Sequence, residues 1–222
     1  MAKETKNEGA EAVAEALSKT EVFIKEYGKW MAYTLIALIL VGVAVFCWYK
    51  FAWQPKKAEA LEQMYPAEAN FRNSEYDLAL NGDGNVLGFA QIIDEYGSKA
   101  GASVYFYAGI CEFNLGNYQE ALSYLKKYKG GDAILSARAT ACMGDAYVGL
   151  EEYEKAVSCY EKAAAAADNV FAAGYLLKAG VTCEQLGQDQ KALGFYKQIK
   201  EKYPQSIQGY DIDKYITRIE VK

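Results

Sequence analysis

The residues that could do chemistry in this chain are cysteines and carboxylates, because its 222 residues include no histidine. Without an imidazole there is no Ser-His or Cys-His nucleophilic pair and no histidine-ligated metal site. The five cysteines form no CxxC pair, and their spacing matches no zinc-binding pattern (Cys47, Cys111, Cys142, Cys159 and Cys183). We therefore interpret them as small buried apolar residues rather than as a disulfide framework.

A second candidate for chemistry is the sequence Asn-Gly-Asp-Gly-Asn at residues 81–85, which suggests a calcium-binding loop. Such a loop needs an acidic ligand at its twelfth position, where Ile92 stands if Asn81 is the first. The segment is therefore predicted to be a turn. We find no constellation of acids, bases, nucleophiles or ligands elsewhere, so the sequence predicts neither an enzyme nor a cofactor or metal site.

The charge of the chain is acidic, with 24 lysines and arginines against 29 aspartates and glutamates and a formal net charge of -5. Proteins that bind nucleic acids usually carry a basic patch or stripe, and none is present in the sequence. The composition therefore predicts no nucleic-acid partner.

Residues 30–49 form an uncharged stretch of 20 residues, bounded by Lys29 and Lys50. As a helix this stretch would be about 30 Å long, which matches the hydrocarbon thickness of a bilayer. Aromatic residues, which prefer the headgroup level, lie at both ends (Trp30, Tyr33, Trp48, Tyr49 and Trp53). The stretch is too long for a cleaved signal peptide, and no small-x-small cleavage site follows it. We predict a single-pass transmembrane helix at 30–49 that contacts the lipid bilayer.

The lysines near this helix leave its orientation open, because three lie close before it and three close after it (Lys19, Lys25, Lys29, Lys50, Lys56 and Lys57). A short tail can remain in the cytoplasm while a larger C-terminal part is exported. We therefore predict a cytoplasmic tail at 1–29 and a repeat domain outside, although free cysteines count against export. The tail has Val13, Leu17 and Ile24 at helical spacing among glutamates, so part of it is either an acidic amphipathic helix or disordered.

An internal repeat is visible in the second half of the chain. The segments LGNYQEAL, LEEYEKAV and LGQDQKAL begin at Leu115, Leu150 and Leu186, so their starts are 35 and 36 residues apart. A glycine stands six residues before each leucine (Gly109, Gly144 and Gly180), and aromatic residues follow each segment. These segments resemble tetratricopeptide repeats, whose unit is a pair of helices about 34 residues long.

The resemblance implies an all-α fold, in which the transmembrane helix precedes an α-solenoid with three tetratricopeptide repeats at 102–204. In this arrangement the glycine lets the two helices of a repeat approach closely, and Pro204 ends the last helix. Residues 205–222 are predicted to contain a capping helix, over 210–221, because the end of a solenoid needs a polar outer face.

Residues 54–101 are predicted to be a degenerate first helical hairpin. We expect one helix over 56–80, a turn over 81–85 and a second helix over 86–96.

In this repeat family the first helices of the repeats line a concave binding surface. The resemblance places nine candidate groove residues on it: Phe106, Ile110, Phe113, Asn114, Arg138, Asp145, Val148, Leu177 and Val181. Some family members bind a C-terminal carboxylate through several cations, but only Arg138 is a cation here. The mostly apolar set favours an extended or helical apolar segment of a protein partner. Alternatively, these residues pack against the first hairpin or the C-terminal helix.

The overall layout of a glutamate-rich tail, one uncleaved span and a small repeat domain resembles the bacterial YfgM-type proteins, which are associated with the secretion translocon and periplasmic chaperones. The resemblance implies a bacterial inner-membrane protein with a periplasmic repeat domain. It would act as a scaffold or chaperone-like adaptor for secretory or envelope proteins near the Sec translocon. The alternatives are an adaptor that faces the cytoplasm, which suits the free cysteines, and a structural assembly factor.

Overall fold

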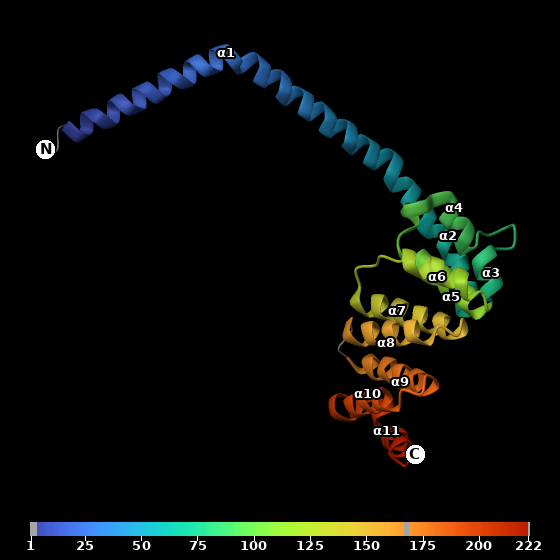
Figure 1. Cartoon of the computed structure of the whole chain (residues 1–222). Coiled ribbons are helices and arrows are strands. Elements are labelled where there is room, and N and C mark those ends of the chain that lie inside the picture. The colour runs from blue at the N-terminus through green and yellow to red at the C-terminus, as the bar shows by residue number, and fades with distance from the viewer. Residues whose placement is uncertain (1–3, 167–168, 222) are drawn as a thin grey trace. The chain divides into compact units, whose positions relative to one another are not determined.

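A computed structural model describes residues 4–166 and 169–221 of the chain (Figure 1). The secondary structure of these residues is helical and includes no strand, so the predicted all-α fold is confirmed. The chain divides into two compact units, Met1–Pro55 and Lys56–Lys222, which we describe separately.

The first unit consists of α1 (Glu4–Trp48), a single long helix, and the π-helical turn η1 (Tyr49–Trp53). Within the part of the chain that the structure describes, one helix is long and apolar enough to cross a membrane, and its apolar window is not buried. A core helix of a soluble domain would instead be mostly buried. By length and composition, the helix therefore fits a membrane span or a signal sequence.

The second unit is a row of short helices joined by tight turns (Figure 1). Within the described residues three antiparallel hairpins follow one another, at 103–127, 133–166 and 170–202, and each of their helices packs against the next. In chain order the elements are α2 (Gln54–Arg72), α3 (Tyr76–Asn81), α4 (Phe89–Tyr96), the 3-10 turn η2 (Gly97–Ala100), α5 (Ser103–Asn114), α6 (Tyr118–Lys127), α7 (Ala133–Gly149), α8 (Tyr153–Ala166), α9 (Val170–Gln185), α10 (Asp189–Lys202) and α11 (Ile207–Glu220).

Glycine in the first helix of each hairpin lets a large side chain of the second helix lie against the backbone. A Cβ atom added to Gly144 would lie 2.6 Å from the ring of Tyr160. One added to Gly180 would lie 2.2 Å from the ring of Tyr196. A Cβ atom added to Gly109 would lie 2.6 Å from the side chain of Leu125. These distances are too short for any side chain, so the hairpin packing requires glycine.

The turn inside each hairpin has the same left-handed geometry. The residue at its centre has a positive φ in all three hairpins: 85° at Gly116, 58° at Glu151 and 70° at Gly187. The next amide then donates a hydrogen bond to the carbonyl five residues earlier, as Glu152 does to Tyr147 at 2.8 Å. This Schellman turn satisfies carbonyl groups at the end of the first helix and starts the second helix at once.

The same turn occurs near the start of the second unit, where we predicted an uninterrupted helix over 56–80. That prediction is wrong, because α2 ends at Arg72 and Ser74 has a φ of 63°. The amide of Glu75 donates to the carbonyl of Asn70 at 3.0 Å, and α3 begins at Tyr76. The turn between α2 and α3 therefore has the same geometry as the turns inside the later hairpins.

The second helix of this first hairpin is interrupted. It runs through α3, breaks over residues 82–88 and resumes as α4 at Phe89 instead of at the predicted Val86. The predicted turn at 81–85 lies largely within this break. Ala79 of α3 is fully buried, as is Ala121 of α6, and each stands three residues after the tyrosine that opens its helix.

The positive φ of Glu151 gives a prediction about stability. A side chain in the left-handed region costs about 1–2 kcal/mol, so Glu151→Gly is expected to stabilise the fold by about 1 kcal/mol after the extra chain entropy of glycine is included. For a chain of this size that gain corresponds to a rise of about 2–4 °C in the midpoint of thermal unfolding, measured by circular dichroism. Gly116→Ala, at the same turn position, should lower the midpoint. A lower midpoint for Glu151→Gly would contradict the assigned turn.

The last helix, α11, packs against α10 as the first helix of a further repeat would. Its buried face is made of Ile212, Ile216 and Ile219, which join the core of the last hairpin. The helix begins at Ile207, three residues before the predicted 210–221, because the hydroxyl of Ser206 accepts a hydrogen bond from the amide of Gly209 at 3.0 Å.

Candidate protein-binding groove

The predicted groove residues divide into buried and accessible side chains. Phe106 is only 7 % exposed and packs against Leu125 and Ala139, so it faces the core and does not line an open groove. Arg138 of α7 lies over its ring, with the guanidinium carbon 5.9 Å from the ring centroid. Tyr128 covers another part of the ring, at a centroid separation of 5.8 Å. Close packing by these neighbours therefore explains why Phe106 is withdrawn from the surface.

Four other predicted groove residues also serve the packing of the solenoid itself. The half-buried side chains pack against core clusters (Ile110, Phe113, Val148 and Leu177). The amide group of Asn114 donates to the carbonyl of Ile110 in its own helix at 2.8 Å. Val181 is exposed on α9. The structure therefore distributes these residues over several clusters and does not gather them into one surface.

Two predicted residues, Arg138 and Asp145, do come together, in a cavity between the first helices of neighbouring hairpins. We name it the α7–α9 cavity, and its volume is about 370 Å³. It is lined by Ile134, Leu135, Arg138, Ala141, Cys142 and Asp145 of α7 and by Phe171, Tyr175 and Lys178 of α9. This volume falls within the range of about 300–1,000 Å³ that is typical of ligand pockets.

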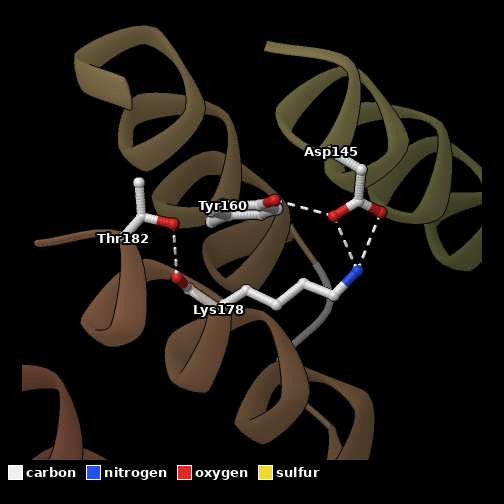
Figure 2. A network of polar contacts seen from close by, with 4 residues as sticks. All are labelled: Asp145, Tyr160, Lys178 and Thr182. Carbon is white, nitrogen blue, oxygen red and sulfur yellow. Dashed lines mark hydrogen bonds and ion pairs between the residues drawn. The ribbon is translucent and has the colours of Figure 1, made fainter. Parts of the chain in front are cut away.

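Two of the residues that line the α7–α9 cavity form an ion pair, and Figure 2 shows its contacts. The ammonium group of Lys178 donates to both carboxylate oxygens of Asp145 at 2.7 Å. The hydroxyl of Tyr160 donates to Oδ1 of the same carboxylate, also at 2.7 Å. The hydroxyl of Thr182 donates to the backbone carbonyl of Lys178 at 2.8 Å, one turn earlier in α9. The side chains of three helices, α7, α8 and α9, therefore meet at one carboxylate.

Tyr160 remains a hydrogen-bond donor in this network over the physiological pH range. It is only 2 % exposed, and burial raises the pKa of its hydroxyl well above the ordinary value. The negative charge of Asp145 and the hydrogen bond to it raise that pKa further. The neutral hydroxyl is the form that stabilises the carboxylate.

The same arrangement recurs between α9 and α11. The hydroxyl of Tyr196 donates to Oε1 of Glu184 at 2.6 Å, and the guanidinium of Arg218 donates to that oxygen at 2.5 Å. Each network joins a tyrosine from the second helix of a hairpin, an acid from the first helix and a cation from the next helix along the row. These networks fix the spacing of α7, α9 and α11.

The sequence prediction identified the cavity face of α7 only in part and missed the face of α9. Ile134, Arg138, Ala141 and Asp145 follow the i, i+4, i+7, i+11 spacing of one helix face, but the prediction began at Arg138. On α9 it chose Leu177 and Val181, whereas the cavity is lined by Phe171, Tyr175 and Lys178. The signal that could have found this second face is its own i, i+4, i+7 spacing.

The cysteines and the 81–85 segment form no metal site among the described residues. All five cysteines have free thiols; Cys111 and Cys183 are fully buried, as predicted, whereas Cys142 and Cys159 are half-buried and Cys47 is exposed. The carboxylate of Asp83 accepts hydrogen bonds from the amides of Asn85 and Val86 at 2.8 and 2.9 Å. These bonds lower its pKa and close the predicted turn.

Cys142 in the α7–α9 cavity gives a prediction about pH. Burial, with a contribution from the charge of Asp145, raises the pKa of its thiol to about 11. Because only the thiolate is nucleophilic, alkylation by iodoacetamide should be slow at pH 7 and should accelerate about tenfold per pH unit until the pH approaches the pKa. Mass spectrometry of the Cys142 peptide measures this rate against glutathione as the control. A rate that stops rising near pH 9 would contradict the assigned environment.

Comparison with known proteins agrees with the repeated hairpins. Two family models described as tetratricopeptide repeat match the chain, one over residues 103–130 and the other over residues 143–207. The chain carries tetratricopeptide repeats. By sequence, no curated protein matches it.

Solved structures show the same fold. The structure described as "Crystal structure of MamA" is 19% identical to this chain, with a TM-score of 0.52, and the match covers 70% of this chain and 92% of that one. The structure described as "MamA 41-end from Desulfovibrio magneticus RS-1" is 15% identical, with a TM-score of 0.53, and covers 77% and 97%. At this identity the likeness establishes the shared repeat fold alone, and the resemblance to YfgM-type proteins stays a prediction.

Proposed function

We propose that this chain is a membrane-anchored adaptor whose repeats bind a protein partner in the α7–α9 cavity. The observation that carries the proposal is the apolar rim of that cavity. Ile134, Leu135 and Phe171 are 46, 41 and 55 % exposed, although side chains of this kind are usually buried. Repeat solenoids commonly present such surfaces to other proteins, and this role requires no catalytic group.

The proposed location is the bacterial inner membrane, with the tail at 1–29 in the cytoplasm and the repeat domain in the periplasm. The exposed apolar residues of α1 support a membrane span, since their transfer from water into a bilayer is favourable. The layout shared with YfgM-type proteins supports a role beside the Sec translocon, as a scaffold or chaperone-like adaptor for secretory and envelope proteins.

Site-specific crosslinking tests the binding surface. A photoreactive amino acid is placed at Leu135, on the cavity rim, or at Lys162, an exposed position on α8, in the full chain expressed in cells. We expect covalent adducts with another protein from position 135 and not from position 162. Equal adducts from both positions, or none from position 135, would overturn the proposed binding surface.

The topology is tested separately, with paired reporters fused after Lys222, one active only in the cytoplasm and one active only outside it. Activity of the external reporter alone is expected. Activity of the cytoplasmic reporter would overturn the periplasmic location and the link to secretion, and it would favour an adaptor that faces the cytoplasm.

A further inference from the structure

The α7–α9 cavity carries an unbalanced positive charge. Lys178 is neutralised by Asp145, to which it makes two hydrogen bonds. Arg138 is exposed and lies over the ring of Phe106, and within the described residues it has no ion pair with a carboxylate. A free guanidinium is thus present in an otherwise acidic protein with a formal net charge of -5. The guanidinium therefore attracts a negative group to the cavity.

The carboxylate of Asp145 is not available to a ligand. Its oxygens already accept two hydrogen bonds from Lys178 and one from Tyr160. A basic ligand would have to displace Lys178 to reach it, and would also be repelled by Arg138. The polar groups of the cavity therefore select against a cationic segment.

The apolar residues of the rim lie on both helices beside this guanidinium. Ile134 and Leu135 stand in the first turn of α7, one turn before Arg138, and Phe171 stands in the first turn of α9. All three line the same cavity as Arg138. A ligand that fits this surface must present a large apolar side chain and a carboxylate close together.

We propose that the α7–α9 cavity binds an internal segment of a partner protein in which a large apolar residue is next to an aspartate or glutamate. The apolar side chain packs between the rim residues of the two helices, and the acidic side chain accepts two parallel hydrogen bonds from Arg138. An internal segment is favoured over a chain terminus because Arg138 is the one cation lining the cavity that has no carboxylate partner among the described residues. The members of this repeat family that bind a terminal carboxylate do so through several cations. This inference rests on the proposed function and specifies its partner.

The probe for this inference is a library of random dodecapeptides displayed on phage through their C-termini, which leaves no free terminal carboxylate. The library is selected on the purified full-length protein in detergent micelles. Enriched peptides are expected to share an acidic residue one or two positions from leucine, isoleucine or phenylalanine. Enrichment of sequences without an acidic residue, or no enrichment, would overturn the inference.

The best enriched peptide is then synthesised with a fluorescent label, and its affinity is measured by fluorescence polarisation. Arg138→Gln is expected to weaken binding about tenfold, because it removes charge-assisted hydrogen bonds at a site that is partly exposed to solvent. Lys162→Gln, which removes an exposed lysine from α8, is the matched control and should leave the affinity unchanged. Unchanged binding to Arg138→Gln, with native helicity, would overturn the inference.

Two further comparisons separate the possible results. The amidated and free-acid forms of the peptide should bind equally, and a requirement for the free acid would show that a chain terminus is the true ligand and overturn the inference. If peptides bind without dependence on Arg138 while crosslinks from position 135 persist, the partner class is wrong and the proposed function stands. If those crosslinks are absent, the proposed function itself fails.

Discussion

Gly180→Ala is expected to destabilise the repeat domain by about 2–3 kcal/mol, in the upper part of the range of about 1–3 kcal/mol that is typical when a methyl group is inserted into a packed site. The new Cβ would lie 2.2 Å from the ring of Tyr196. That ring has no room to move, because Tyr196 is fully buried and its hydroxyl is held by Glu184. The midpoint of thermal unfolding, followed by circular dichroism, should fall by roughly 4–12 °C.

The control for this change is Gly194→Ala. Gly194 lies in the interior of α10, and no side chain or neighbouring backbone among the described residues lies within 4 Å of its added Cβ. Alanine there is expected to raise stability by about 0.5–1 kcal/mol through helix propensity alone. A fall for Gly180→Ala of less than 2 °C would show that α9 and α10 do not approach as closely as described.

The later repeats could be predicted from the sequence because their geometry demands particular residue types. No other residue fits where Gly144 and Gly180 meet the tyrosine rings, so the glycines mark the repeat spacing. The first hairpin was predicted at 54–101, but its turn was placed at 81–85, because the true turn uses Ser74, a residue that adopts positive φ only when the surrounding structure imposes it. The break over residues 82–88 separates α3 from α4, so the prediction assigned the residues of α3 to the first helix.

The candidate site was harder to predict, because a cavity between two helices depends on which faces oppose each other. A family register placed Phe106 on the groove, but the packing of Tyr128 and Arg138 around its ring decides its burial. The partners of Asp145 come from two other helices, at Tyr160 and Lys178, and separations of 15 and 33 residues are not visible as local patterns. The spacing of residues along the chain predicts which side chains share a helix face. Contacts between helices decide whether that face is buried or lines a cavity.

Asp145→Ala is the second change with a large expected effect, and it tests the network that joins α7, α8 and α9. The hydroxyl of Tyr160 would lose its acceptor inside the protein, and an unsatisfied buried hydroxyl costs about 1–3 kcal/mol. The ion pair with Lys178 contributes less than about 1 kcal/mol, because the Lys178 side chain is 49% exposed. We expect a total loss of about 2 kcal/mol, measured as a fall in the thermal midpoint.

A double-mutant cycle of Asp145 and Tyr160 measures how much of this loss of stability comes from the hydrogen bond between the two side chains. Tyr160→Phe removes the hydroxyl and should destabilise the fold by about 1 kcal/mol on its own, since it breaks one hydrogen bond to a charged group. In the Asp145→Ala background the same change should have little further effect or partly restore stability, because no hydroxyl is then left unpaired. Lys178→Met should lower stability by less than about 1 kcal/mol.

The two possible results of the cycle have different meanings. If the effects of Asp145→Ala and Tyr160→Phe simply add, the two side chains act independently and α8 is not tied to its neighbours through this carboxylate. If they are coupled by about 1 kcal/mol, the Asp145 carboxylate, which lines the α7–α9 cavity, also holds α8 against α7, so the packing around the cavity depends on Asp145.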